Sequence, residues 1–194
     1  MSRRSAERGS VQGRPEPIAP AVAVLGIGSV LMSDDSVGPH VVKLLDARYT
    51  FPDSVSVLEL GTPGMDLAPY LADIEALIIV DSVRADGPPG SVHCYRREQL
   101  LSHPPTLRTT PHDPAIKEAL LTAEFAGGGP AEVLLVGVVP ASIAQGTELS
   151  PAVAAALPAV EAAVLAELER LGCPGAARPV PAEPELWWRR GAPD

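Results

Sequence analysis

The chain has 194 residues, a formal net charge of −9 and an apolar share of 46%. These values suit one globular domain with a full core and argue against a disordered protein. The acidic balance, with no basic block, argues against a protein that follows nucleic-acid phosphates. Aromatic residues make up only 4% of the chain, so the core is expected to consist of Val, Leu, Ile and Ala.

The cysteines and the apolar runs bear on where the protein works. Cys94 and Cys173 lie far apart and form no C-x-x-C motif, which indicates a reduced, cytoplasmic setting. No apolar run reaches the roughly 18 residues of a membrane span, so membrane insertion is not expected. No apolar segment follows the arginine pair near the N-terminus, so no secretory or twin-arginine signal is expected.

Both ends of the chain predict segments outside the folded domain. Residues 1–20 are polar and proline-containing, which predicts a disordered leader. Residues 173–194 predict a proline-rich tail, in which Trp187 and Trp188 either dock on the body or bind a partner. The stretch between them, 21–172, is expected to form a single α/β domain.

The predicted elements begin with residues 21–27, a continuous apolar run typical of a strand buried on both faces. Pro39 lacks an N–H and fits only the first turn of the helix that follows, which places Asp35 or Ser36 at its N-cap. Pro158 is expected to kink or split the last helix. Further strands are predicted at 55–60, 76–80, 91–95 and 133–139, and further helices at about 113–125 and 150–172.

The order of these elements predicts a three-layer α/β domain, with a twisted, mostly parallel five-stranded sheet between helices. The link before strand 91–95 is too short for a crossover helix, so this strand is expected to be antiparallel and at an edge. Right-handed crossovers place the first strand beside the third. That topological switch point would bring Asp35 together with Asp81, the residue that follows strand 76–80.

The turn after the first strand resembles a nucleotide-binding loop only in part. Gly26 and Gly28 match two glycines of G-x-G-x-x-G, but Leu31 takes the place of the third. Asp34 and Asp35 then lie at the start of the following helix, where a bound pyrophosphate needs positive potential. A nucleotide-binding domain is therefore the weaker interpretation, and the glycines are interpreted as letting the chain turn tightly and come close to another group.

Acidic residues gather at the same predicted edge of the sheet. Asp34, Asp35 and Asp81 would repel one another unless a cation is present. Two carboxylates with an imidazole suit Ni, Zn, Co or Mn, and His112 is placed to complete such a set. The alternatives stay open: the acidic pair can serve as a cap and turn, which is favoured for Asp34. Asp81 can simply cap a loop amide, and His112 can be a plain loop residue.

A series of short segments, in order and at matching separations, resembles the nickel-dependent hydrogenase maturation endopeptidases. The resemblance covers about 21–172, and no G-x-S-x-G or H-E-x-x-H motif competes with it. In this sequence Ser29 replaces the usual Asn, and Asp35 is one methylene shorter than the glutamate of some members. The matching segments are Gly26–Gly38, Gly61–Leu67, Ile78–Val83, Thr110–His112, Leu135–Pro140 and Leu149–Pro151.

The resemblance implies a cytoplasmic, monomeric endopeptidase that removes a C-terminal extension from the large-subunit precursor of a [NiFe] hydrogenase after nickel insertion. The family's catalytic and metal-binding positions fall on Asp35, Asp81 and His112, and the nickel is expected to arrive with the substrate. The rival hypothesis is a non-catalytic nickel-binding or large-subunit escort protein. With the family's substrate in view, the glycines of the first turn are expected to clear space for its large metal centre. The residues expected to form substrate loops are Gly26, Gly28, Asp34, Gly61, Thr62 and Gly64.

Overall fold

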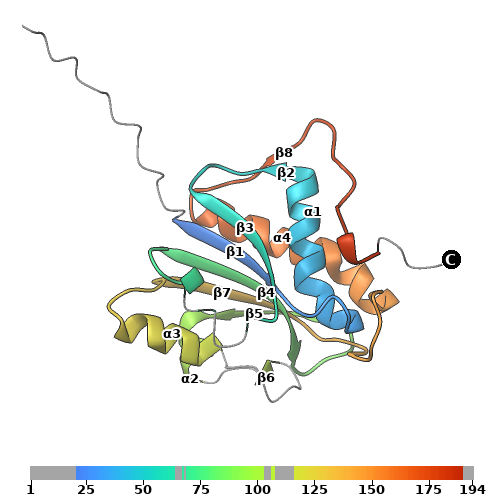
Figure 1. Cartoon of the computed structure of the whole chain (residues 1–194), viewed down its shortest axis with the longest axis horizontal. Coiled ribbons are helices and arrows are strands. Elements are labelled where there is room, and N and C mark those ends of the chain that lie inside the picture. The colour runs from blue at the N-terminus through green and yellow to red at the C-terminus, as the bar shows by residue number, and fades with distance from the viewer. Residues whose placement is uncertain (1–20, 64–66, 68, 103–105, 108–115, 190–194) are drawn as a thin grey trace, which may run out of the picture.

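The central sheet has the strand order β3-β1-β4-β7-β5 (Figure 1). A computed structural model of the chain describes residues 21–63, 67, 69–102, 106–107 and 116–189. β1, β3, β4 and β7 are parallel, and β5 pairs antiparallel with β7 at the edge, which confirms the predicted sheet. The strands are β1 (Val22–Ile27), β3 (Val55–Gly61), β4 (Ala76–Arg84), β5 (Val92–Arg96) and β7 (Glu132–Val138).

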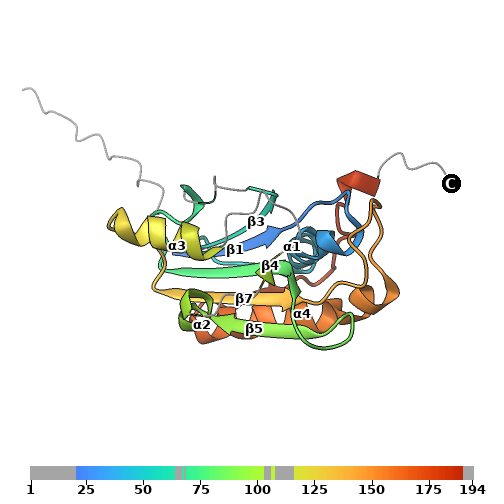
Figure 2. The same ribbon diagram turned by 90° about the horizontal axis from the view of Figure 1, so that it is seen from below.

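Helices cover both faces of this sheet, which makes the predicted three layers (Figures 1 and 2). One face carries α1 (Val37–Arg48) and α4 (Pro151–Arg170), and the other carries α2 (Arg97–Ser102) and α3 (Ile116–Phe125). The 3-10 helix η1 (Ser33–Ser36) leads into α1. The sequence pattern missed α2, because a six-residue helix is too short to show a clear 3.6-residue period.

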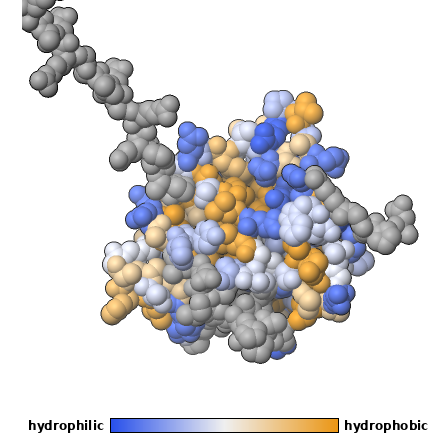
Figure 3. Space-filling model, viewed as in Figure 1, coloured by the Kyte–Doolittle hydropathy of each residue, from blue (hydrophilic) through white to orange (hydrophobic). Residues whose placement is uncertain are grey.

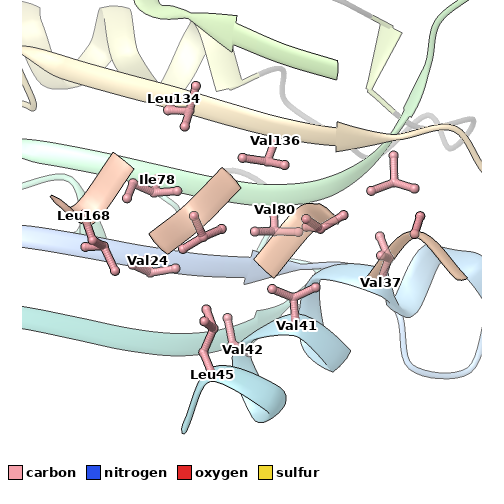
Figure 4. Packing of buried hydrophobic residues seen from close by; sticks show 14 of the residues in the cluster. Val24, Val37, Val41, Val42, Leu45, Ile78, Val80, Leu134, Val136 and Leu168 are labelled. Atoms are coloured by element: carbon pink, nitrogen blue, oxygen red, sulfur yellow. The ribbon is translucent and has the colours of Figure 1, made fainter. Parts of the chain in front are cut away.

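The two cores follow the alternation of side chains along the strands. In β4, Ile78 and Val80 face α1 and α4, whereas Leu77 and Ile79 face α2 and α3. The core under α1 and α4 consists almost entirely of Val, Leu, Ile and Ala, as the low aromatic content predicts (Figure 4). β1 and β4 are buried on both faces, so packing from both helical layers holds the ends of these two strands in place.

α4 runs without a break through Pro158, so the predicted split is wrong. Val160, Val164 and Leu168 are all fully buried, and their packing offsets the hydrogen bond that the proline removes. The predicted N-cap is confirmed, since the Ser150 side chain accepts a hydrogen bond from a backbone N–H in the first turn. By length and composition alone α4 would suffice to cross a membrane, but its apolar stripe packs on the sheet as in a core helix.

The segment after α4 returns along α1 toward the start of that helix (Figure 1). Its strand β8 (Ala176–Ala177) pairs with β2 (Tyr49–Thr50), and it ends in the 3-10 helix η3 (Trp187–Arg189). Trp188 is only 8% exposed, and its ring lies 5.0 Å from that of His40. Of the two alternatives left by the sequence, docking on the body is therefore what Trp188 does.

β3 forms the other edge of the sheet and is only partly covered. In the space-filling view an apolar area lies where β3 runs in Figure 1, and another lies over α3 (Figure 3). Leu58 in β3 and Leu121 and Phe125 in α3 are exposed apolar side chains. β3 and α3 thus carry part of the exposed apolar surface, and Leu31, Val180 and Trp187 are exposed elsewhere.

Candidate functional site

The candidate site lies beyond the carboxyl ends of β1 and β4, where the chain enters α1 (Figure 2). β1 lies between β3 and β4, as the right-handed crossovers predict. The β1–β4 pairing ends at Gly26 and Val80, so Asp81 is the first β4 residue beyond it. The expectation that the strand ends at Asp81 is wrong, because β4 continues to Arg84 through its pairing with β7 and with β6 (Thr106–Leu107).

Asp35 is held from two sides. It lies in η1 and is 7% exposed. Its Oδ2 accepts a hydrogen bond of 2.8 Å from the backbone N–H of Ser29, and its Oδ1 accepts one of 2.8 Å from the Ser82 hydroxyl. The plane of this carboxylate is therefore set by the turn after β1 and by the end of β4 together. Ser36, one of the two predicted residues, takes the N-cap position of α1.

Asp81 is buried beside it, at 2% exposed. Its Oδ1 accepts a hydrogen bond of 2.7 Å from the backbone N–H of Ser82. Ser82 therefore contacts both carboxylates, and the structure brings Asp35 and Asp81 together as predicted from the switch point. The sequence analysis missed Ser82. The signal was the alternation along the strand, which places the residue after Asp81 on the face of the sheet where α1 begins.

Asp34 has a different role from its neighbour. It is fully buried and accepts hydrogen bonds from three backbone N–H groups, those of Ala141 and Ser142 at Oδ2 and that of Ser150 at Oδ1. These donors lie at the two ends of the 141–150 loop. The carboxylate thus fastens this loop to η1, in keeping with the structural interpretation favoured for Asp34, and its side chain is not presented at the surface.

The glycines of the first turn do not clear space for a substrate, which corrects that expectation. A Cβ on Gly28, whose φ is +143°, would lie 1.8 Å from the carbonyl oxygen of Asp35. A Cβ on Gly26 would lie 2.4 Å from the carbonyl oxygen of Gly38. These positions are glycine because the end of β1 crosses directly beneath η1 and α1. The space is filled by the protein's own backbone.

The second glycine loop is more open. Gly61 has a φ of +58°, and no atom lies within 4 Å of the place where its Cβ would be. Its carbonyl accepts a hydrogen bond of 2.7 Å from the N–H of Gly28, which ties this loop to the first turn. Thr62 follows as an exposed residue. Gly64 lies outside the described residues, so its place in a substrate loop stays a prediction.

His112 also lies outside the described residues, so the third metal ligand stays a prediction. Within the described parts of the chain, no three His, Cys, Asp or Glu side chains are grouped to hold a metal ion. His40 is a packing residue: its Nδ1 lies 2.9 Å from the Ser36 carbonyl oxygen, and burial lowers its pKa. Two buried, oriented carboxylates fit a divalent cation that takes oxygen ligands and accepts an imidazole as the third.

Comparison with known proteins agrees with this geometry. The family described as "Hydrogenase maturation protease" matches residues 39–167. The chain is 36% identical to the hydrogenase 2 maturation protease of Escherichia coli over 156 residues, which are 78% of this chain and 92% of that protein. It is 34% identical to the hydrogenase expression/formation protein HoxM of Azotobacter vinelandii, over 85% of this chain and 80% of that protein.

Solved structures show the same fold. The hydrogenase maturating endopeptidase HybD from E. coli superposes with a TM-score of 0.74 at 33% sequence identity, covering 81% of this chain and 97% of that one. The [NiFe] hydrogenase maturation protease HybD from Thermococcus kodakarensis superposes with a TM-score of 0.58 at 25% identity, covering 77% and 97%. The sheet, its antiparallel edge strand and the covering helices therefore follow an endopeptidase fold.

Proposed function

This chain belongs to the hydrogenase maturation protease family, and we propose that it removes the C-terminal extension from the large-subunit precursor of a [NiFe] hydrogenase after nickel insertion. One observation carries the proposal beyond the family name. Asp35 and Asp81 arrive from separate elements, are both buried, and are both held by Ser82. Two carboxylates collected at one buried point offer the oxygen ligands that a divalent cation takes.

In this proposal the cation is the nickel that the precursor carries. Asp35 and Asp81 present carboxylate oxygens to it, and His112 adds an imidazole nitrogen. Nickel bound there supplies Lewis-acid polarisation of a nearby carbonyl. The protein's contribution is orientation: the Ser29 N–H and the Ser82 hydroxyl hold the Asp35 carboxylate in one plane before the substrate arrives.

The open loop at Gly61 and Thr62 supports the same placement of the substrate. Gly61 has free space where a Cβ would be, and Thr62 is exposed. The Gly28–Gly61 hydrogen bond couples this loop to the turn that carries Asp35. A peptide passing over Gly61 would therefore approach the two carboxylates from the edge formed by β3.

The test follows loss of the extension by mass spectrometry after the purified full chain is mixed with precursor large subunit, with and without nickel. The parent is expected to shorten the nickel-loaded precursor and to leave the nickel-free precursor intact. Asp35→Asn, Asp81→Asn and His112→Ala are expected to lower the cleavage rate at least about 100-fold, the scale on which oriented metal ligands act. Asp53→Asn, at an exposed acid remote in sequence from these residues, is the matched control and is expected to cleave like the parent.

Each part of the proposal can fail separately in this experiment. Equal cleavage of nickel-loaded and nickel-free precursor would contradict recognition of nickel by the protein. Parent-like cleavage by the three variants would contradict the roles assigned to Asp35, Asp81 and His112. Binding of the precursor by the parent with no change in mass would favour the escort or nickel-binding function instead.

A further inference from the structure

Ser82 connects the two acids of the candidate site through different atoms. Its hydroxyl lies 2.8 Å from Oδ1 of Asp35, and its backbone nitrogen lies 2.7 Å from Oδ1 of Asp81. The residue is 3% exposed, so water does not compete for either hydrogen bond. A buried hydroxyl that donates to a carboxylate forms a charge-assisted bond, which is stronger than one between neutral groups.

The position of Ser82 in β4 explains how one residue reaches both. Neighbouring side chains in a strand point to opposite faces of the sheet. The face shared by Ile78 and Val80 packs on α1, and Ser82 continues this alternation toward η1, where Asp35 lies. Asp81 continues the other face, which Leu77 and Ile79 share. Ser82 thus lies between two carboxylates that start from opposite sides of the sheet.

These hydrogen bonds orient the Asp35 and Asp81 carboxylates, and the groups that donate them carry no charge. The hydroxyl and the two backbone N–H groups of Ser29 and Ser82 are neutral donors, and each occupies one lone-pair direction of a carboxylate oxygen. These three hydrogen bonds therefore limit how the Asp35 and Asp81 carboxylates can rotate. Partners of this kind, one step removed from a metal, commonly change metal affinity 10–100-fold.

We propose that Ser82 is a positioning residue that fixes the Asp35 and Asp81 carboxylates relative to each other for a divalent cation. The proposal rests on the proposed function, because it assigns these carboxylates to the nickel of the precursor. Ser82 itself touches neither metal nor peptide in this proposal. Its effect passes through the orientation of Asp35.

Substitution by Thr and by Val gives a matched pair of variants. Thr adds a methyl group to Ser and keeps the hydroxyl, and Val has nearly the shape of Thr with a methyl group in place of that hydroxyl. Any loss caused by crowding is therefore common to Ser82→Thr and Ser82→Val. The difference between them reports the hydrogen bond to Asp35. Ser82→Ala removes the hydroxyl without adding volume and serves as the third variant.

Two quantities are measured on the full chain: the dissociation constant for Ni²⁺ alone by calorimetry, and kcat and KM for cleavage of nickel-loaded precursor. Thermal unfolding is recorded in parallel, and the assays run well below each variant's Tm. Ser82→Ala and Ser82→Val are expected to weaken Ni²⁺ binding about tenfold and to lower kcat/KM about as much. Ser82→Thr is expected to stay within about threefold of the parent in both quantities.

Equal values for the Thr and Val variants in both assays would overturn the proposal, as would parent-like values for Ser82→Ala. A Tm difference between Thr and Val with equal Ni²⁺ affinity and kinetics would make Ser82 a purely structural residue, which also overturns it. If the parent binds Ni²⁺ but leaves the precursor uncut, the proposed function fails. The role of Ser82 is then decided by the Ni²⁺ dissociation constants of the three variants. If the parent neither binds nor cuts, both proposals fall.

Discussion

In the part of the chain that the structure describes, buried acids occur in two regions, and their hydrogen-bond and ion-pair partners differ between the two. At the carboxyl ends of the strands, Asp34 accepts hydrogen bonds from backbone N–H groups, and Asp35 accepts from a backbone N–H and a hydroxyl. On α4, Glu161 and Glu167 pair with arginines. Glu167 takes both nitrogens of one guanidinium, that of Arg96, in a bidentate contact.

The two arrangements have different effects. Arginine pairs fasten one element to another, whereas hydrogen bonds from neutral donors orient a carboxylate. Arg170 bonds Glu167 in its own helix and Glu132 in β7, while Arg96 reaches Glu167 from β5. This charged network ties three elements together and neutralises the buried acid. Neutral donors, by contrast, direct a carboxylate without supplying a positive charge. Under the proposed function, the second arrangement suits a region that receives a cation.

The largest expected effect comes from Asp34→Asn. All three donors to Asp34 are backbone N–H groups, which cannot accept a hydrogen bond, and they use both carboxylate oxygens. The new NH₂ group would face an N–H at Ala141 or Ser150 and leave it unpaired. We expect a loss of about 3–5 kcal/mol in the free energy of unfolding, measured by urea denaturation. Asp53→Asn, at an exposed position, is the control, and an equally small loss in both would contradict this account.

Glu167→Gln tests the region on α4 in which buried acids pair with arginines. The change leaves Arg96 and Arg170 facing a neutral amide where they now share a carboxylate. We expect a loss of about 3 kcal/mol in the free energy of unfolding, because two guanidinium groups lose their common counter-charge. Glu124→Gln breaks the exposed Arg97–Glu124 pair and is expected to cost less than about 1 kcal/mol. Similar losses from the two variants would mean that burial does not distinguish these pairs.

The stability of the parent should also fall in acid through Glu167. Burial raises the pKa of this carboxyl, but hydrogen bonds from Arg170 and Arg96 outweigh that effect and lower the pKa from 4.5 to about 2. Its contribution is therefore complete above about pH 4.5 and is lost as the pH falls toward 2. A shift of this size corresponds to at most about 3–4 kcal/mol, and less where solvent screens the carboxylate. Urea denaturation between these pH values should show the loss in the parent and a weaker pH dependence in Glu167→Gln.

The smallest stability effect is expected from Asp35→Asn. The amide oxygen can accept from the Ser29 N–H, and the NH₂ group can donate to the Ser82 hydroxyl, which reverses its own role. We expect a change below about 1 kcal/mol in the free energy of unfolding, while the proposed function predicts a cleavage rate at least about 100-fold lower. If Asp35→Asn destabilises the protein as much as Asp34→Asn, the two neighbours do not differ in the way the hydrogen bonds indicate.

Much of the fold and part of the site were predictable from local pattern. The apolar runs placed the strands, Ser150-Pro151 placed the start of α4, and the order of elements placed β1 beside β4. That order was enough to bring Asp35 and Asp81 together. Family resemblance added the endopeptidase activity, and the comparisons support it. The position of His112 relative to these acids remains a prediction from that resemblance.

The sequence by itself determined which residues form strands and helices, and which edge of the sheet collects the acids, because both depend on periodicity and on the handedness of short connections. Only the tertiary structure decided that Asp34 fastens a loop more than 100 residues away while Asp35 faces Ser82. It also decided that Gly26 and Gly28 make room for the protein's own helix. These facts depend on contacts between segments distant in the chain, and adjacent aspartates carry no local signal of which partners folding will bring to each.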